Sequence, residues 1–235
     1  MSQVGNHIQR ISSLYSKGIP SDDSRLSRRH IYDVLLSVRA ALLFNKLNKN
    51  QKISRWNYSY LSCTELEEVP PHQCPGLPVV GCKILRTKCR LPKPINKLSG
   101  HVIESVSSID GEVLFDETTW TQKKYKSHNK YTGKRPDFFI KDDYLYITVT
   151  KKVKAITIAG LFYDPIEVDQ FMTSCNNCED CNECPTDPME LDLNIDEDLS
   201  RDLAMMAAEE LIGMFNKSRE DQSNDSDDSL DQESK

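Results

Sequence analysis

The chain has 235 residues and a formal net charge of −6, with 28% charged and 38% hydrophobic residues. This length suits one sizeable domain with appendages or two small domains. No apolar run reaches the roughly 18 residues of a membrane-spanning helix, so we expect no such helix. The first ten residues, MSQVGNHIQR, lack the apolar core of a secretion signal, and we therefore expect a protein made in the cytosol.

The charge is spread unevenly along the chain. Residues 1–60 carry ten Lys or Arg and three Asp, a net +7, whereas residues 217–235 carry seven acids and three basic residues, a net −4. This polarity suits a subunit that packs head to tail with its own copies, or one that meets different partners at its two ends. Two solvated surfaces would explain the charges equally well.

The first 52 residues are predicted to form a helical arm. Apolar residues at helical spacing indicate one helix over residues 4–17 and a second, with a stronger pattern, over about residues 25–49. The acidic and hydroxyl residues 21–24 are suited to cap the second helix. Three arginines fall largely off its apolar stripe: Arg28, Arg29 and Arg39.

Residues 53–170 are predicted to form a β-rich middle domain. Strands are expected over residues 58–69 and 82–89. Two hairpins follow, one turning at Asp110-Gly111 and the other at Asp142-Asp143. A strand over residues 154–162 is expected to pair with the second hairpin, which would give a three-stranded antiparallel meander with one buried face.

The C-terminal part begins with a short helix, which Pro165 is expected to open. Residues 171–190 form a cysteine-rich loop, residues 191–217 contain an amphipathic helix that ends near Asn216, and the acidic residues 218–235 are expected to be disordered. The predicted class is α+β, with the terminal helices packed with the antiparallel middle domain. The stripe of the last helix is Leu199, Leu203, Met206, Ala207, Leu211 and Met214.

Four of the eight cysteines form one cluster, CNNCEDCNEC. Thiolates at three-residue steps can close around a tetrahedral zinc, and the run is one residue short of a ferredoxin pattern. In a reducing compartment structural disulfides are not expected. A site shared with other cysteines of the chain and an inert acidic loop are the alternatives. We expect no cofactor, with zinc as the one candidate at this cluster: Cys175, Cys178, Cys181 and Cys184.

A lysine-rich stretch, WTQKKYKSHNKYTGKRP, interleaves cations with Tyr125 and Tyr131. Cations contact phosphates and aromatic rings stack on bases, so the stretch is a candidate for DNA contact without sequence preference. A solvated loop is the simpler interpretation. The candidate residues are Lys123, Lys124, Lys126, Lys130, Lys134 and Arg135. Common catalytic motifs are absent from the sequence and the five histidines are dispersed, so we predict no enzyme.

Several stretches together resemble one family of structural proteins. They are GIPSDDSRLSRRHIYDVLLSVRAALL, QKISRWNYSYLSCTEL, CKILRTKCRLPKP, FDETTW, YTGKRPDFFIKDDYLYI, ITIAGLFYDP and IDEDLSRDLAMMAAEELI. With these blocks, residues 5–216 resemble the ring, or head-to-tail connector, proteins of crAss-like phages of gut Bacteroides. The cysteine loop and the acidic tail carry no part of this resemblance.

The resemblance implies a virion protein in the neck of a tailed phage. Such a subunit forms a homo-oligomeric ring, expected to be dodecameric, which lies below the portal protein, lines the DNA channel and recruits other neck and tail ring proteins, without contact to a membrane. The candidates for subunit or portal contact are Arg28, Arg29, Arg39, Leu199, Leu203 and Met206. The alternative is a metal-containing nucleic-acid-binding regulatory protein, built on the cysteine cluster and the lysine-rich stretch.

Overall fold

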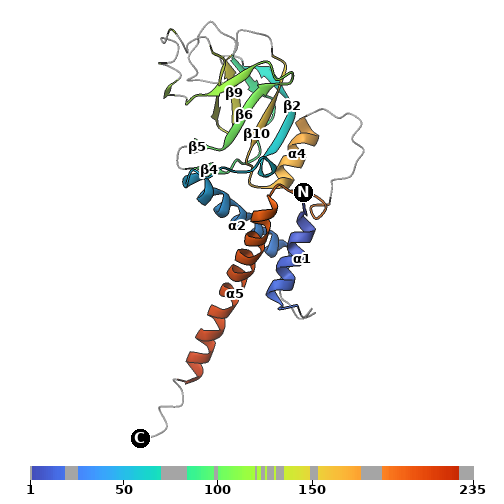
Figure 1. The fold of residues 1–235 in the computed structure, drawn as a ribbon, viewed down its shortest axis with the longest axis vertical. Helices are drawn as coiled ribbons and strands as arrows, with labels where there is room; N and C mark the ends of the chain where they lie inside the picture. Colours follow the sequence, from blue (N-terminus) through green and yellow to red (C-terminus); the bar gives the residue numbers. More distant parts are fainter. Residues whose placement is uncertain are drawn as a thin grey trace. The chain divides into compact units, whose positions relative to one another are not determined.

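The computed structural model divides into two compact units (Figure 1). Unit 1, the helical unit, comprises Met1–Ile53 and Asp187–Lys235, and unit 2, the barrel unit, comprises Ser54–Thr186. The helical unit is therefore built from both ends of the sequence. The structure describes residues 2–18, 26–69, 84–97, 100–119, 121–122, 125, 130, 135–148, 153–175 and 187–227.

The helical unit has a core that three helices share. Its elements are α1 (Val4–Tyr15), α2 (Arg28–Asn48), α5 (Glu197–Asp227) and the antiparallel ribbon of β1 (Ser2–Gln3) and β11 (Asp192–Leu193). α5 contacts both α1 and α2, and α1 also contacts α2. Small side chains at Ala204, Ala207 and Ala208 are buried on α5, so the neighbouring helices can approach it closely.

The barrel unit closes a seven-stranded sheet on itself in the order β10-β2-β3-β9-β8-β7-β6. The strands are β2 (Ser59–Glu68), β3 (Ile84–Thr87), β6 (Ile103–Ser108), β7 (Leu114–Glu117), β8 (Asp137–Lys141), β9 (Tyr144–Thr148) and β10 (Ala155–Gly160). Neighbours run antiparallel except the parallel pair β7 and β8. Closure gives every strand two neighbours and so removes the unpaired edges of an open sheet.

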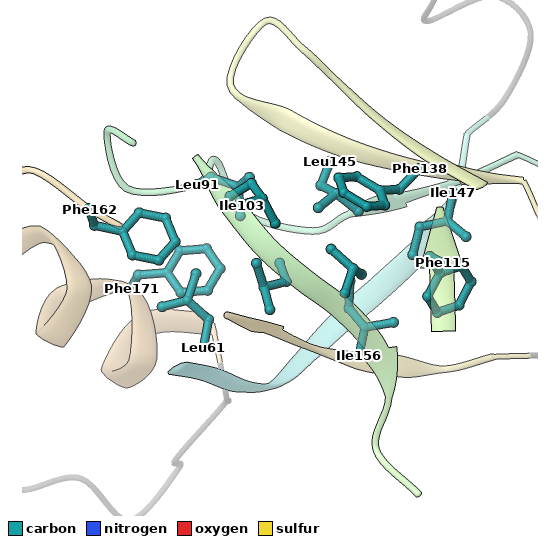
Figure 2. Close-up of a cluster of buried hydrophobic side chains, with 12 residues drawn as sticks. Leu61, Leu91, Ile103, Phe115, Phe138, Leu145, Ile147, Ile156, Phe162 and Phe171 are labelled. Atoms are coloured by element: carbon teal, nitrogen blue, oxygen red, sulfur yellow. The ribbon is translucent and has the colours of Figure 1, made fainter. Parts of the chain in front are cut away.

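The barrel interior holds the apolar core of this unit (Figure 2). Alternate residues point inward, as on β10, where Ile156 and Ile158 are fully buried. The helix α4 (Pro165–Cys175) contacts β2 and adds Phe171 to the core cluster. Three smaller elements complete the unit: the 3-10 helix η1 (Arg55–Asn57) and the paired strands β4 (Asn96–Lys97) and β5 (Gly100–His101).

The α+β class and both predicted hairpins are confirmed. Asp142 and Asp143 have φ of 53° and 64°, the left-handed values that a tight two-residue hairpin turn requires, and they join β8 to β9. Gly111, with φ of 72°, lies in the turn between β6 and β7. Pro165 opens α4, as expected for a residue whose missing N–H leaves no helical bond unmade at that position.

The predicted three-stranded meander is wrong. β10 pairs with β2 and β6, and the place beside β9 is taken by β3. Consecutive strands pair more often than distant ones, and this preference guided the prediction. In a closed barrel the last strand must instead join the two strands that would otherwise have open edges.

Two helix boundaries also differ from the prediction. α2 begins at Arg28, and its cap is Ser27, whose side chain accepts a hydrogen bond from the His30 N–H, rather than any of residues 21–24. α5 continues to Asp227 instead of ending near Asn216. The remaining residues of the acidic tail, 228–235, lie outside the described part of the chain.

Candidate assembly surfaces

The tip of the β6–β7 hairpin is held by its own hydrogen bonds. The Asp110 carboxylate accepts from the Ser108 hydroxyl and, at 3.2 Å, from the Glu112 N–H. The Ser108 oxygen in turn accepts from the Val113 N–H at 3.1 Å, and the Gly111 N–H donates to the Ser108 carbonyl at 2.9 Å. These bonds fix the turn, so the side chains around it are presented in a defined arrangement.

This hairpin exposes apolar side chains among acids. Ile109 is 58% exposed and Leu114 is 66% exposed. The segment Ile103–Glu117 contains no Lys, Arg or His and carries five acids: Glu104, Asp110, Glu112, Asp116 and Glu117. We call residues 109–116 the hairpin surface. Two large aliphatic side chains are thus exposed on one fixed hairpin.

A groove of about 580 Å³ lies elsewhere on the barrel unit, between the loop after β3, the β8–β9 turn and α4. Its lining includes Arg90, Leu91, Pro92, Lys93, Glu167 and Phe171. The Leu91 N–H donates to the Asp143 carbonyl at 2.8 Å, and the Lys93 N–H donates to the Glu167 carboxylate at 2.9 Å. The loop is therefore tied to both the turn and the helix.

Two cations at the groove are held over aromatic rings. The Arg90 guanidinium lies 5.9 Å from the centroid of the Tyr144 ring, and the Lys93 ammonium lies 5.2 Å from that of Tyr163. Within the described residues neither cation has an ion-pair partner. Both charges are thus oriented yet available to an acidic partner.

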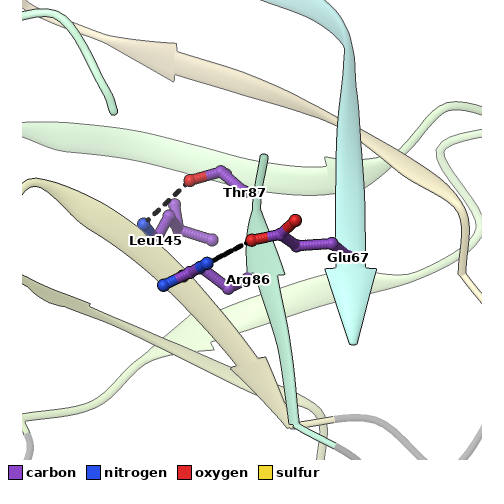
Figure 3. Close-up of polar contacts among 4 residues, drawn as sticks. All are labelled: Glu67, Arg86, Thr87 and Leu145. Carbon is purple, nitrogen blue, oxygen red and sulfur yellow. Dashed lines mark hydrogen bonds and ion pairs between the residues drawn. The ribbon is translucent and has the colours of Figure 1, made fainter. Parts of the chain in front are cut away.

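The strand that leads into this loop is fastened by a polar network (Figure 3). Arg86 pairs with Glu67 on β2 and lies over Tyr144, with 4.7 Å between the guanidinium carbon and the ring centroid. The hydrogen bond to Glu67 raises the pKa of Arg86, against the opposite effect of its burial. The Thr87 hydroxyl accepts from the Leu145 N–H at 3.3 Å. β3 is consequently joined to β2 and β9 by side chains as well as by backbone pairing.

Comparison with known proteins gives the family. Residues 6–231 match the model of a family described as phage tail ring protein 2, of the crAss ring type. The chain belongs to this family. The match confirms the resemblance to crAss-like phage ring proteins and identifies a structural protein of the phage tail. A search of curated proteins gave no match.

The ring protein presents only some of its predicted contact residues at its surface. Arg28, Arg29 and Met206 are exposed. Leu199 and Leu203 are buried in the helical unit. Met214 is also exposed, although it was placed on the buried stripe of α5. That stripe is rotated toward Ala204 and Ala208, so Met206 and Met214 lie outside it.

Arg39 is not on the surface where the sequence analysis placed it. It is only 1% exposed and donates from Nε and Nη2 to the Asn194 carbonyl, at 3.3 and 3.0 Å. α5 packs against α2. Arg39 therefore joins α2 to the segment before α5 and is not available to another subunit.

The lysine-rich stretch is described only in part. Tyr125, Lys130 and Arg135 are exposed, as a DNA-contacting loop requires. The other predicted contacts lie outside the described residues: Lys123, Lys124, Lys126 and Lys134.

The cysteine cluster also lies outside the part of the chain whose side chains are described. Cys175 ends α4, and Cys178, Cys181 and Cys184 follow in that segment. Elsewhere Cys63 carries an exposed free thiol, whereas Cys89 is in a disulfide, contrary to the expectation for a reducing compartment. Among the described residues no group of His, Cys, Asp and Glu is arranged to hold a metal ion.

Two buried titratable groups belong to the cores. Burial, and secondarily the charge of Arg10, lowers the pKa of His7 on α1. Burial, followed by the neighbouring Glu104 carboxylate, raises the pKa of Tyr58 to about 12. Each group is thus held neutral at neutral pH. In the described helices no apolar segment is long enough to cross a membrane.

Neither the hairpin surface nor the groove was predicted from the sequence. The sequence does contain a feature that corresponds to each surface. Ile109 and Leu114 flank a turn of polar residues, and the segment KILRTKCRLPK, residues 83–93, carries five cations and no acid. The sequence does not show that Ile109 and Leu114 are exposed, or that residues 83–93 lead into a loop that packs against α4.

Proposed function

We propose that this chain is a structural subunit of the phage neck, forming an oligomeric ring below the portal that connects the capsid to the tail and lines the DNA channel. The family match over residues 6–231 carries the proposal. Because it includes both the helical unit and the barrel unit, the ring role applies to the whole chain. The work of such a subunit is mechanical, and we propose no enzymatic activity.

The exposed cations support the channel-lining part of this proposal. Tyr125 and Lys130 lie exposed within the lysine-rich stretch, and Arg135 lies exposed near its end. A channel for packaged DNA needs contacts to phosphate rather than to base edges, and flexible cations supply them. The proposed ring has twelve copies, and the portal and other neck rings are its partners.

Imaging of virions tests the location. A Fab fragment raised against the purified chain should decorate the neck, between capsid and tail, in electron micrographs of intact particles. Decoration of the capsid shell or of tail fibres, or absence of the chain from purified virions, would contradict the proposal.

Native mass spectrometry of the chain mixed with the portal protein of the same phage tests the assembly. The expected product is a complex of one portal ring with twelve copies of the chain. A complex with another stoichiometry would correct the copy number, and no complex at all would argue against the portal as the partner.

A further inference from the structure

We propose that the hairpin surface of one copy seats in the Arg90/Lys93 groove of the next copy and that this contact joins the subunits of the ring. The inference rests on the proposed function in one respect, namely that copies of this chain contact one another. It adds which two surfaces meet.

The barrel topology keeps these two surfaces apart within one chain. In the closed order, β7 is the third strand from β3 in one direction and β6 is the third strand in the other. The β6–β7 pair therefore lies across the barrel from β3. Strand directions separate them lengthwise as well. β6 is antiparallel to β10, β10 to β2, and β2 to β3, so the end of β6 that leads to Ile109 and the end of β3 that leads to Arg90 are at opposite ends of the barrel.

Because the surfaces are opposed, the hairpin surface of one chain cannot reach the groove of the same barrel. A contact between two different surfaces of identical subunits is heterologous, and its repetition gives a ring when the rotation closes. Two different surfaces that lie apart on one barrel meet the requirement for such a heterologous contact.

The two surfaces are complementary in charge. The hairpin surface offers Glu112 with no cation in its segment, and the groove offers Arg90 and Lys93 without ion-pair partners in the described residues. The lining also carries the carboxylates of Asp143 and Glu167, so the groove has no net charge, and the complementarity lies in where the two cations are placed. Pairing of opposite charges at fixed positions sets the register of two proteins.

The surfaces are also complementary in apolar character and in shape. Ile109 projects from a turn, and Leu91, Pro92 and Phe171 lie in the lining of the groove. The groove volume of about 580 Å³ is within the usual range for a binding cleft, about 300–1,000 Å³. Both sides are fixed before they meet, the turn by Asp110 and the loop by Asp143 and Glu167, so little conformational entropy is lost on binding.

Photo-crosslinking tests the contact directly. The full chain is made with benzoylphenylalanine in place of Ile109, concentrated, irradiated and digested for mass spectrometry. We expect covalent dimers whose crosslinks map to residues 88–93 or 165–171 of the other copy. Crosslinks to other segments, or no covalent dimer, would overturn the inference. The same label at Ser62, an exposed position on β2, is the control and should give few dimers.

Charge reversal gives the second test. The double variant Arg90→Glu/Lys93→Glu should lower the yield of dimers crosslinked through position 109 by about tenfold or more, because central charged contacts dominate interface energies. Lys49→Glu/Lys52→Glu makes the same change in net charge at two exposed positions just after α2 and should leave the yield unchanged. Equal losses in both variants would count against the groove.

Mixing variants tests the head-to-tail arrangement. A groove variant (Arg90→Glu/Lys93→Glu) and a hairpin variant (Ile109→Ser/Glu112→Gln) each keep one intact surface. Alone neither should associate, and together they should form a one-to-one dimer that grows no further, measured by analytical ultracentrifugation. A dimer of either variant alone would refute the pairing. If a Fab places the chain in the neck while these results fail, the inference falls and the proposed function stands.

Discussion

Arg39 is among the largest of the fully buried side chains in the described residues. A buried cation must be hydrogen-bonded, because its desolvation is otherwise too costly. Its Nε and Nη2 atoms both face the Asn194 carbonyl, which lies between β11 and α5. One side chain thereby connects residues 155 positions apart in sequence, from the N-terminal and C-terminal halves of the helical unit.

Replacing this residue tests that connection. Arg39→Met keeps the apolar stem and removes the donors, which deprives the Asn194 carbonyl of these bonds. We expect a loss of about 1–3 kcal/mol in the free energy of unfolding, measured by urea titration. Arg29→Met on the exposed face of the same helix should change it by no more than about 0.5 kcal/mol. Equal effects of the two substitutions would show that the buried bonds contribute nothing specific.

His7 makes the helical unit sensitive to acid. Its folded-state pKa lies below the ordinary histidine value of 6.5, since burial and then the Arg10 charge oppose protonation. The unfolded chain therefore binds the proton first as pH falls, and the stability present above pH 6.5 is lost progressively below it. Thermal melts of the wild type should show a larger loss of stability between neutral and mildly acidic pH than those of His7→Gln. Parallel losses would assign the acid sensitivity to other groups.

Residue-level roles of this kind were only partly predictable. Helical spacing correctly predicted α1, because the helix has a single buried face, which includes Ile8 and Ile11. Arg39 was misplaced because α2 is covered on more than one side, and the covering helix comes from the far end of the sequence. Periodicity along α2 contains no information about a partner that distant.

At the scale of elements, Gly160 marks where β10 approaches its neighbours closely. A Cβ at this position would lie 3.0 Å from the Ile103 side chain and 3.3 Å from the Val102 carbonyl oxygen. Gly160→Ala should therefore destabilise the barrel unit by about 1–3 kcal/mol through overpacking. The check is the unfolding midpoint followed by near-ultraviolet circular dichroism. An unchanged midpoint would mean that the strand shifts at no cost.

Gly213, on α5, is a glycine with open space around it, in contrast to Gly160. Nothing lies within 4 Å of a Cβ added there, and the residue is exposed. Since Gly is about 0.8–1.0 kcal/mol less favourable than Ala inside a helix, Gly213→Ala should stabilise α5 by up to that amount. Helix content and melting temperature by far-ultraviolet circular dichroism measure it. A destabilised variant would indicate that this face of α5 is less open than its exposure suggests.

The elements themselves show which signals are local. Both hairpins were predictable because Asp-Gly and Asp-Asp turns act on adjacent residues. The pairing of β10 with β2 and β6 was not, because it depends on closure of the whole sheet. The end of α5 was missed for a related reason. Its acidic residues beyond Asn216 carry no apolar stripe, so the hydrophobic pattern stops before the backbone helix does.

For the whole molecule, the contacts between subunits were harder to predict from the sequence than the fold class. The α+β class follows from composition and spacing along the chain. An interface does not, because apolar residues that a partner covers have the same sequence pattern as those that the chain itself covers. Ile109 and Leu199 are both large aliphatic residues among polar neighbours in the sequence, yet the side chain of Ile109 is exposed and that of Leu199 is buried.

The two units also differ in how they can fold. The barrel unit is one continuous segment, Ser54–Thr186, with its own closed sheet and core, so this fragment should fold alone and melt cooperatively.

The helical unit needs α5 from the other end of the chain, because α1 and α2 bury their apolar faces against it. A fragment of residues 1–53 should therefore have little helix in circular dichroism, and adding a fragment of residues 187–235 should restore it. Stable helix in the first fragment alone would contradict the role of α5 as the element around which this unit forms.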